Sequence, residues 1–356
     1  MRTLIRAMSA CIIIALSACD AIVDSVGNLP NSLPRNDQVG SNSTSITVTD
    51  LGTLGGNNGI AFAINPRGQI VGTSRDANGQ DRPFLWEKGV MTDLGTLTDG
   101  AQSTAYGVNA SGKAVGYMLE RTHALATLWQ DGEIIDLGTL GGPNAIAAAI
   151  NASGAVTGHF TGGDKGALHA FIWRKGEMVD LGTTGDCVKC WAGGLAINNA
   201  GQIVGWTDVE SFPSGDLLTH AFLWDNGKTT DLGTLPGAEA SYARAINEAG
   251  DVVGYTLSAD GRVKRGFLWR KGTMTELPLV ANGINSSGDI VGYITMPDRT
   301  SHAALLRKAE LIDLGFVAGY TESVAYAIND AGEIVGSSLG NASGTLIGRA
   351  TMWTVR

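Results

Sequence analysis

The stretch Ile150-Asn151-Ala152-Ser153-Gly154-Ala155-Val156-Thr157-Gly158 is repeated, with small changes, along most of the chain. Its Asn-x-x-Gly core occurs seven times, and the copies begin at Asn65, Asn109, Asn151, Asn198, Asn247, Asn285 and Asn329. Six intervals cover the 264 positions from the first copy to the last, a mean spacing of 44 residues. A fixed period of this length is typical of solenoids, propellers and related arrays.

Three further elements keep step with the Asn-x-x-Gly core. A pair of small residues such as Ala61 and Ala63 precedes it, and an apolar run ending in glycine, such as Ile70-Val71-Gly72, follows it. An aromatic run such as Phe84-Leu85-Trp86 comes next, and an Asp-Leu-Gly run ends the repeat. The apolar runs are short, rich in Ile, Val, Phe and Trp, and bounded by Gly and Asn, so they predict strands rather than helices. Asn-x-x-Gly predicts a type I turn, and Trp-x-x-Gly a second tight turn.

Four antiparallel strands in about 44 residues match one propeller blade, whose innermost strand needs small residues near the axis. A parallel β-helix fits less well, because its coils are shorter and lack these tight reversals. The first strand, roughly Ile46 to Leu54, is an isolated Asp-Leu-Gly element, and the last repeat lacks this element. The sequence therefore predicts an all-β, seven-bladed β-propeller of four-stranded antiparallel blades over residues 46–356. The N-terminal strand would complete the last blade and close the ring.

The repeat resembles the HAF repeat family of bacterial extracellular proteins. The runs Leu51-Gly52-Thr53-Leu54-Gly55-Gly56, Leu137-Gly138-Thr139-Leu140-Gly141-Gly142 and His169-Ala170-Phe171-Ile172-Trp173 carry the likeness, which extends from about residue 46 to the end. The resemblance implies an extracytoplasmic location but no particular activity. The sixth repeat departs from the pattern, with Arg307 where Trp is expected and Pro278 in place of the Asp-Leu-Gly glycine.

Residues 1–18 have the pattern of a signal peptide, with a basic start and an apolar core too short to span a bilayer. The core ends in Leu16-Ser17-Ala18-Cys19, which resembles a bacterial lipobox, so we expect lipidation at Cys19; the alternative is an ordinary signal peptide with an incidental cysteine. Residues 19–45 are polar and aperiodic, which indicates a flexible tether. The expected location is the bacterial cell envelope, periplasmic or at the cell surface, with membrane contact through the lipid.

The formal net charge of −9 disfavours nucleic acid as a partner. A basic residue stands four positions before the tryptophan in five repeats: Arg82, His169, His220, Arg265 and Arg349. These residues could form a ring of anion ligands, or each could pair with the aspartate of Asp-Leu-Gly in its blade. No cofactor, metal site or catalytic residue is expected, and we expect a monomer.

Both tight turns fall on one face of the disc, so the variable connections share the other, where binding residues are usually found. The fourth repeat has the longest connections there, and its ligand-binding candidates are Trp191, Trp206, Asp208, Glu210 and Phe212. Cys187 and Cys190 are the disulfide candidate; a redox pair lacks its usual βαβ context, and zinc lacks a second ligand pair. Residues 75–81 fit a hairpin turn better than a calcium loop.

These observations favour a lipid-anchored binding or interaction module with a protein or glycan ligand on the variable-loop face. One alternative is a glycan-cleaving hydrolase or lyase, which would need paired carboxylates about 5–10 Å apart at the central channel. The other is a structural envelope protein without a small ligand.

Overall fold

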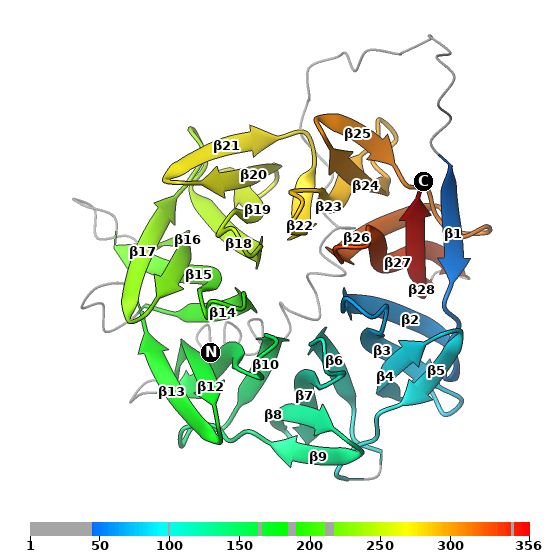
Figure 1. Cartoon of the computed structure of the whole chain (residues 1–356), viewed down its shortest axis with the longest axis horizontal. Helices are drawn as coiled ribbons and strands as arrows, with labels where there is room; N and C mark the ends of the chain where they lie inside the picture. The colour runs from blue at the N-terminus through cyan, green and yellow to red at the C-terminus, as the bar shows by residue number, and fades with distance from the viewer. Residues whose placement is uncertain (1–44, 99, 163–165, 184–189, 211–216, 343–344) are drawn as a thin grey trace.

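The computed structural model describes residues 45–98, 100–162, 166–183, 190–210, 217–342 and 345–356. These residues form 28 strands in seven four-stranded antiparallel sheets, arranged around a central axis (Figure 1). The described part contains no helix long and apolar enough to cross a membrane. The seven-bladed β-propeller expected from the repeats is confirmed.

Each blade contributes one strand to each of four positions between the axis and the rim. The innermost strands are β2 (Gly55–Ile64), β6 (Ser103–Val108), β10 (Ala145–Ile150), β14 (Ala192–Ile197), β18 (Ala240–Ile246), β22 (Val280–Ile284) and β26 (Glu322–Ile328). The second strands are β3 (Ile70–Asp76), β7 (Ala114–Glu120), β11 (Val156–Gly162), β15 (Ile203–Glu210), β19 (Val252–Leu257), β23 (Ile290–Thr295) and β27 (Glu333–Ala342).

The aromatic run of each repeat forms the third strand, and the Asp-Leu-Gly run forms or follows the outermost one. The third strands are β4 (Asp81–Glu87), β8 (His123–Gln130), β12 (Ala167–Arg174), β16 (Leu217–Asp225), β20 (Lys264–Arg270), β24 (Ser301–Arg307) and β28 (Thr345–Val355). The outermost strands are β5 (Val90–Asp93), β9 (Glu133–Asp136), β13 (Glu177–Gly182), β17 (Lys228–Gly233), β21 (Thr273–Leu277), β25 (Glu310–Asp313) and β1 (Ile46–Asp50).

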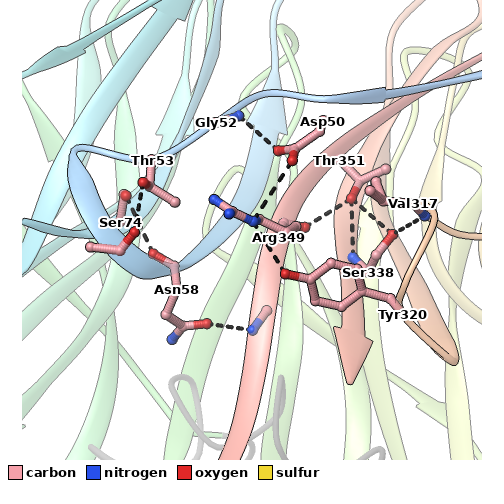
Figure 2. A network of polar contacts seen from close by, with 12 residues as sticks. Asp50, Gly52, Thr53, Asn58, Ser74, Val317, Tyr320, Ser338, Arg349 and Thr351 are labelled. Atoms are coloured by element: carbon pink, nitrogen blue, oxygen red, sulfur yellow. Dashed lines mark hydrogen bonds and ion pairs between the residues drawn. The ribbon is translucent and has the colours of Figure 1, made fainter. Parts of the chain in front are cut away.

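The N-terminal strand completes the seventh blade, as expected. Strand β1 pairs antiparallel with β28, and Ser45 and Arg356 exchange two backbone hydrogen bonds of 3.0 Å. A polar network continues the junction (Figure 2): the Arg349 guanidinium lies 3.7 Å from the Asp50 carboxylate and donates a hydrogen bond of 3.2 Å to the Tyr320 hydroxyl. The Asn58 side chain in the first blade accepts a hydrogen bond of 2.7 Å from the Gly348 backbone N–H in the seventh. The ring is therefore closed by strand pairing and by contacts between blades.

The small-x-small pairs flank a β-bulge in every innermost strand. In the first blade the register with β3 shifts between Ala61 and Ala63, so that Phe62 has no cross-strand partner. The same shift occurs at the equivalent pair in the other six blades. A side chain on Gly283 would come within 3.0 Å of the Tyr326 carbonyl oxygen in the next blade. Small residues are needed here because neighbouring innermost strands approach closely.

The glycine of the Ile-Val-Gly run is explained by the same bulge. A Cβ at Gly158 would overlap the carbonyl oxygen of Ile146 on the adjacent strand. The equivalent overlap exists at the other six positions: Gly72, Gly116, Gly205, Gly254, Gly292 and Gly336. The repeat thus keeps glycine where the bulged strand brings its backbone against the next strand.

Both predicted turns are present. In the first blade the Gly68 backbone N–H donates to the Asn65 carbonyl oxygen at 3.0 Å, the bond expected of the four-residue turn. Between β4 and β5, Lys88 and Gly89 have φ values of 50° and 88°. Two consecutive positive φ angles define a type I′ hairpin, whose twist matches that of the strands.

The sixth blade keeps four strands, and its register corrects the sequence alignment. In the third blade Trp173 lies opposite Val156, and in the sixth blade the equivalent Ile290 lies opposite Leu306. Leu306, not Arg307, therefore occupies the tryptophan position. The one-residue offset is not evident in the sequence, because the sixth blade has no tryptophan to mark the position. Pro278 follows β21 and belongs to the fifth blade.

Candidate functional site

The strand order separates the molecule into two faces. Successive strands of each blade run in opposite directions, so the Asn-x-x-Gly turns and the outer hairpin turns share one face. We call it the turn face, and the opposite one, which carries the variable connections, the loop face. The division expected from the sequence is confirmed.

The seven repeated asparagines form a closed ring of hydrogen bonds near the turn face. Each side-chain Nδ2 donates to the backbone carbonyl oxygen of the asparagine in the next blade, at distances from 2.8 to 3.3 Å. The last bond joins Asn329 to Asn65 and closes the circle. All seven residues are buried. The repeated asparagine is therefore a structural link between blades and not a binding residue.

The repeated basic residues also have structural partners. Arg82 pairs with Asp93, His169 with Asp180, and His220 with Asp231, at 2.8–2.9 Å. Related pairs join Arg265 to Glu276, Arg349 to Asp50 and His302 to Asp313. The aspartate's other oxygen accepts the N–H of the Asp-Leu-Gly glycine, as Asp93 does from Gly95 at 2.7 Å. Each acid thus fixes its own blade, which supports the pairing interpretation over a ring of anion ligands.

In the fourth blade, Trp191 and Asp208 lie together where the loops of the loop face meet the sheet. The Trp191 backbone N–H donates to Asp208 Oδ2 at 3.2 Å, and the Asp208 N–H donates to the Trp191 carbonyl oxygen at 2.7 Å. Thr219 Oγ1 donates to the other carboxylate oxygen at 3.1 Å. Asp208 therefore fixes the two strand ends. Glu210 is the last residue of β15, opposite Leu217.

Trp206 begins a row of half-buried aromatic rings that runs into the fifth blade. Its ring lies 6.5 Å from that of Tyr242, which stacks on Tyr255 with centroids 5.3 Å apart and planes 24° from parallel. Lys264 Nζ lies 5.5 Å from the Tyr255 centroid. Gly193 makes room for the indole, since a Cβ there would come within 2.9 Å of Trp206 Nε1. We call Trp206, Tyr242, Tyr255 and Lys264 the aromatic row.

The Tyr242 hydroxyl stays protonated at neutral pH. Burial raises its pKa above 10, a hydrogen bond with Thr219 acts in the opposite direction, and the charge of Asp208 raises it further. A neutral phenol can both donate and accept a hydrogen bond.

Sequence reasoning found Trp206 but missed Tyr242, Tyr255 and Lys264. A signal was present: the residue after the Ile-Val-Gly glycine is aromatic in four repeats, namely Tyr117, Trp206, Tyr255 and Tyr293. Tyr242 is the cross-strand neighbour of Tyr255, so its place depends on the register of the innermost hairpin.

A histidine occupies this position in the third blade. His159 is 2% exposed, and neither ring nitrogen has a hydrogen-bond partner among the described residues. Burial lowers its pKa from 6.5 to about 4, so the ring is neutral. Its cross-strand neighbour Ala170 lines a crevice between the third and fourth blades with a volume of about 10 Å³, room for about one water molecule.

Several expected residues fall outside the described part of the chain: Cys19, Cys187 and Phe212. Cys190 is buried and disulfide-bonded. In the described ranges, no group of three or more His, Cys, Asp and Glu side chains could hold a metal ion. The innermost strands carry a single carboxylate, Glu322, which accepts a hydrogen bond from the Ser301 N–H. These strands therefore offer no carboxylate pair of the kind that the glycan-cleaving alternative needs.

Comparison with known proteins supports the fold. No protein-family model matches the chain, and no curated protein matches it. The β-propeller domain of the trilobed protease from Pyrococcus furiosus superposes with a TM-score of 0.51 at 11% identity, covering 84% of this chain and 95% of that one. An acylaminoacyl peptidase superposes with a TM-score of 0.50 at 11% identity, covering 84% of this chain and 52% of that one. The Pyrococcus domain is described as having an open velcro topology, whereas β1 pairs with β28 here.

Proposed function

We propose that this protein is a lipid-anchored binding module of the bacterial cell envelope and that its ligand is a glycan held on the loop face over the aromatic row. The observation that carries the proposal is the row itself, three adjacent half-buried rings from two blades. The likeness of the repeats to the HAF family and the lipobox-like sequence at Cys19 support the envelope location.

The chemistry of the row suits a sugar. The C–H face of a sugar ring is apolar and packs on an aromatic ring, while its hydroxyls need donors and acceptors nearby. The Tyr242 hydroxyl and the Lys264 ammonium supply such groups beside the rings. A few polar groups among aromatic side chains is the usual composition of a small-ligand site.

The scaffold supports recognition rather than movement. Strand pairing at β1 and β28 and the asparagine ring join all seven blades. Side chains on such a frame keep their positions when the ligand is absent, which lowers the entropic cost of binding.

The test is binding of envelope glycans, measured on a glycan array and by cross-linked pull-down with mass spectrometry and glycan analysis. Trp206→Ala should weaken binding by at least about ten-fold, because truncating a central aromatic contact commonly costs more than 1 kcal/mol. Tyr117→Ala is the matched control, because Tyr117 occupies the same strand position in the second blade and is also half-buried.

Equal binding by the Trp206→Ala protein and the control would refute the placement of the ligand. A pull-down that enriches one protein and no glycan would instead identify a protein ligand. For the anchor, Cys19→Ala should move the protein from the membrane to the soluble fraction, and retention in the membrane would exclude lipidation at Cys19 as the attachment.

A further inference from the structure

The residue at each β-bulge belongs to a ring of seven side chains around the axis. These are the middle residues of the small-x-small pairs, and we call them the collar: Phe62, Tyr106, Ala148, Leu195, Arg244, Asn282 and Tyr326. They occupy equivalent positions on the innermost strands, which surround the axis in Figure 1. The collar therefore forms a single layer across the centre of the ring.

The flanking residues show why the collar residues lie at the inner edge of each blade. Ala61 packs with Phe84 and Val335 on the side of the seventh blade, and Ala63 packs with Val71 on the side of the second. Phe62 stands between them without a cross-strand partner. With both sheet faces occupied by its neighbours, the bulged residue is left at the inner edge of the blade.

The collar has an aromatic side. The Phe62 ring lies 5.1 Å from Tyr106 in the second blade and 5.6 Å from Tyr326 in the seventh. The first of these contacts is edge-to-face, with planes 62° apart. Three adjacent blades thus contribute to one aromatic wall, in which Phe62 is half-buried. Tyr106 and Tyr326 are each 9% exposed and also pack in clusters with Tyr117 and Tyr293.

The opposite side of the collar carries one cation, Arg244. It lies three blades from both Phe62 and Tyr106 in the ring, and it is the only Lys or Arg in the seven innermost strands. Arg244 is half-buried and makes no hydrogen bond or ion pair within the described part of the chain. The other half-buried arginines described all have an acidic partner: Arg75, Arg82, Arg265, Arg307 and Arg349.

A half-buried guanidinium without an acid is unusual in a chain with a net charge of −9. Three acids at or beside the ends of the innermost strands have partners elsewhere. Glu322 accepts from Ser301, Glu248 accepts from Asn199, and Asp330 accepts from Ser286. Desolvation of a charge is compensated only by a paired charge or hydrogen bonds, so an anion that enters the collar gains a preformed partner.

We propose that the collar is a second binding site, separate from the aromatic row, that takes a carboxylate carried on a six-membered ring. Arg244 holds the carboxylate through its planar fork of N–H donors, and the wall of Phe62, Tyr106 and Tyr326 contacts the ring. The fork matches two carboxylate oxygens, as an ammonium cannot. A uronic acid and an aromatic acid both carry a carboxylate on a six-membered ring. The titrations below distinguish these two ligands.

The experiment is calorimetric titration of the full-length protein at fixed ionic strength with sodium glucuronate and sodium benzoate. Glucose and benzamide are the neutral counterparts. We expect at least one acid to bind and its neutral counterpart to bind at least ten-fold more weakly. The acid that binds more tightly shows whether the collar takes a sugar ring or an aromatic ring.

Three variants locate the site. Arg244→Gln should weaken the acid about 10- to 100-fold, the range for a hydrogen-bonded charged group. Arg244→Lys keeps the positive charge but lacks the planar fork of N–H donors. It should therefore lose less affinity for the acid than Arg244→Gln does. Arg262→Gln changes the net charge equally at an exposed loop position of the same blade and should bind as the unaltered protein does.

Thermal melting curves establish that each variant is folded before it is titrated. The proposal is overturned if neither acid binds, or if Arg244→Gln and Arg262→Gln bind the acid equally. The titrations report on the collar through Arg244→Gln, and the glycan array reports on the aromatic row through Trp206→Ala, so failure at the collar and failure at the aromatic row are told apart.

Discussion

Replacing His159 by phenylalanine should remove a large part of the acid sensitivity of this protein. The imidazole is 2% exposed and has no hydrogen-bond partner among the described residues, so the folded state disfavours its charged form. Phenylalanine keeps an aromatic ring at a strand position where the second blade already places Tyr117. The substitution should therefore cost little at neutral pH.

The magnitude follows from the pKa. Burial lowers the pKa of His159 from 6.5 to about 4, so between these values the unfolded chain binds one proton more than the folded one. Stability then falls as the pH falls through this window, and at about 1.4 kcal/mol per pKa unit the loss reaches about 3 kcal/mol at pH 4. Carboxylates affect stability at lower pH than His159 does. The hydrogen bond from Arg270 lowers the pKa of Asp251 below 3.8, so the stability that Asp251 contributes is lost only when the pH falls below that value.

The assay is urea unfolding followed by tryptophan fluorescence at pH 7.5, 6.5, 5.5 and 4.5. The unaltered protein should lose about 2–3 kcal/mol across this range that the His159→Phe protein retains. His123→Gln is the control, because it removes an exposed histidine and should leave the pH dependence unchanged. Parallel pH profiles for the His159→Phe and unaltered proteins would refute the reasoning, as would a pKa near 6.5 for His159 measured by NMR.

Three further predictions concern the stability of the seven-bladed propeller. Asn329→Ala removes the bond to the Asn65 carbonyl oxygen and the acceptor of the Glu333 backbone N–H, and should lower the unfolding free energy by about 1–3 kcal/mol in urea; an unchanged midpoint would contradict a structural asparagine ring. Thr47→Pro removes an N–H that faces β28 in the hydrogen-bonded register and should lower the melting temperature, whereas Thr47→Ala should not. Equal melting temperatures would mean that β1 is dispensable. Gly158→Ala forces a Cβ onto the Ile146 carbonyl oxygen and should cost about 3 kcal/mol in urea unfolding, and a loss below 1 kcal/mol would show that the bulge can relax.

The fold could be predicted from the sequence because each repeated residue has one physical task that recurs in every blade. Asn151 shows this most clearly: its Oδ1 accepts the Ala155 N–H within the turn, and its Nδ2 donates to the next blade. A residue whose task is identical in seven places leaves a period in the sequence. The tryptophan position was predicted wrongly where that period is degenerate, in the sixth blade, because Leu306 and not Arg307 occupies it.

The candidate site could be predicted only in part, for the opposite reason. Trp206 and Asp208 stand out because the fourth repeat is long, but Tyr242 meets Trp206 across a blade boundary. A contact between blades depends on how two sheets pack, and no spacing within one repeat encodes it. Asp208 also shows that an acidic residue near a loop can be fully engaged in holding that loop.

The residues of the collar differ between blades, and the structure explains why. The positions on either side of it are held to alanine or glycine by close backbone approach, whereas the bulged residue between them has no cross-strand partner. Its identity is therefore free to differ from blade to blade, and it does, from Phe62 to Ala148 to Arg244. In a repeat fold, a position that varies from blade to blade between two positions held to small residues indicates that something other than the scaffold selects the residue. A half-buried arginine with no acid to balance it is the strongest instance of such variation in this chain.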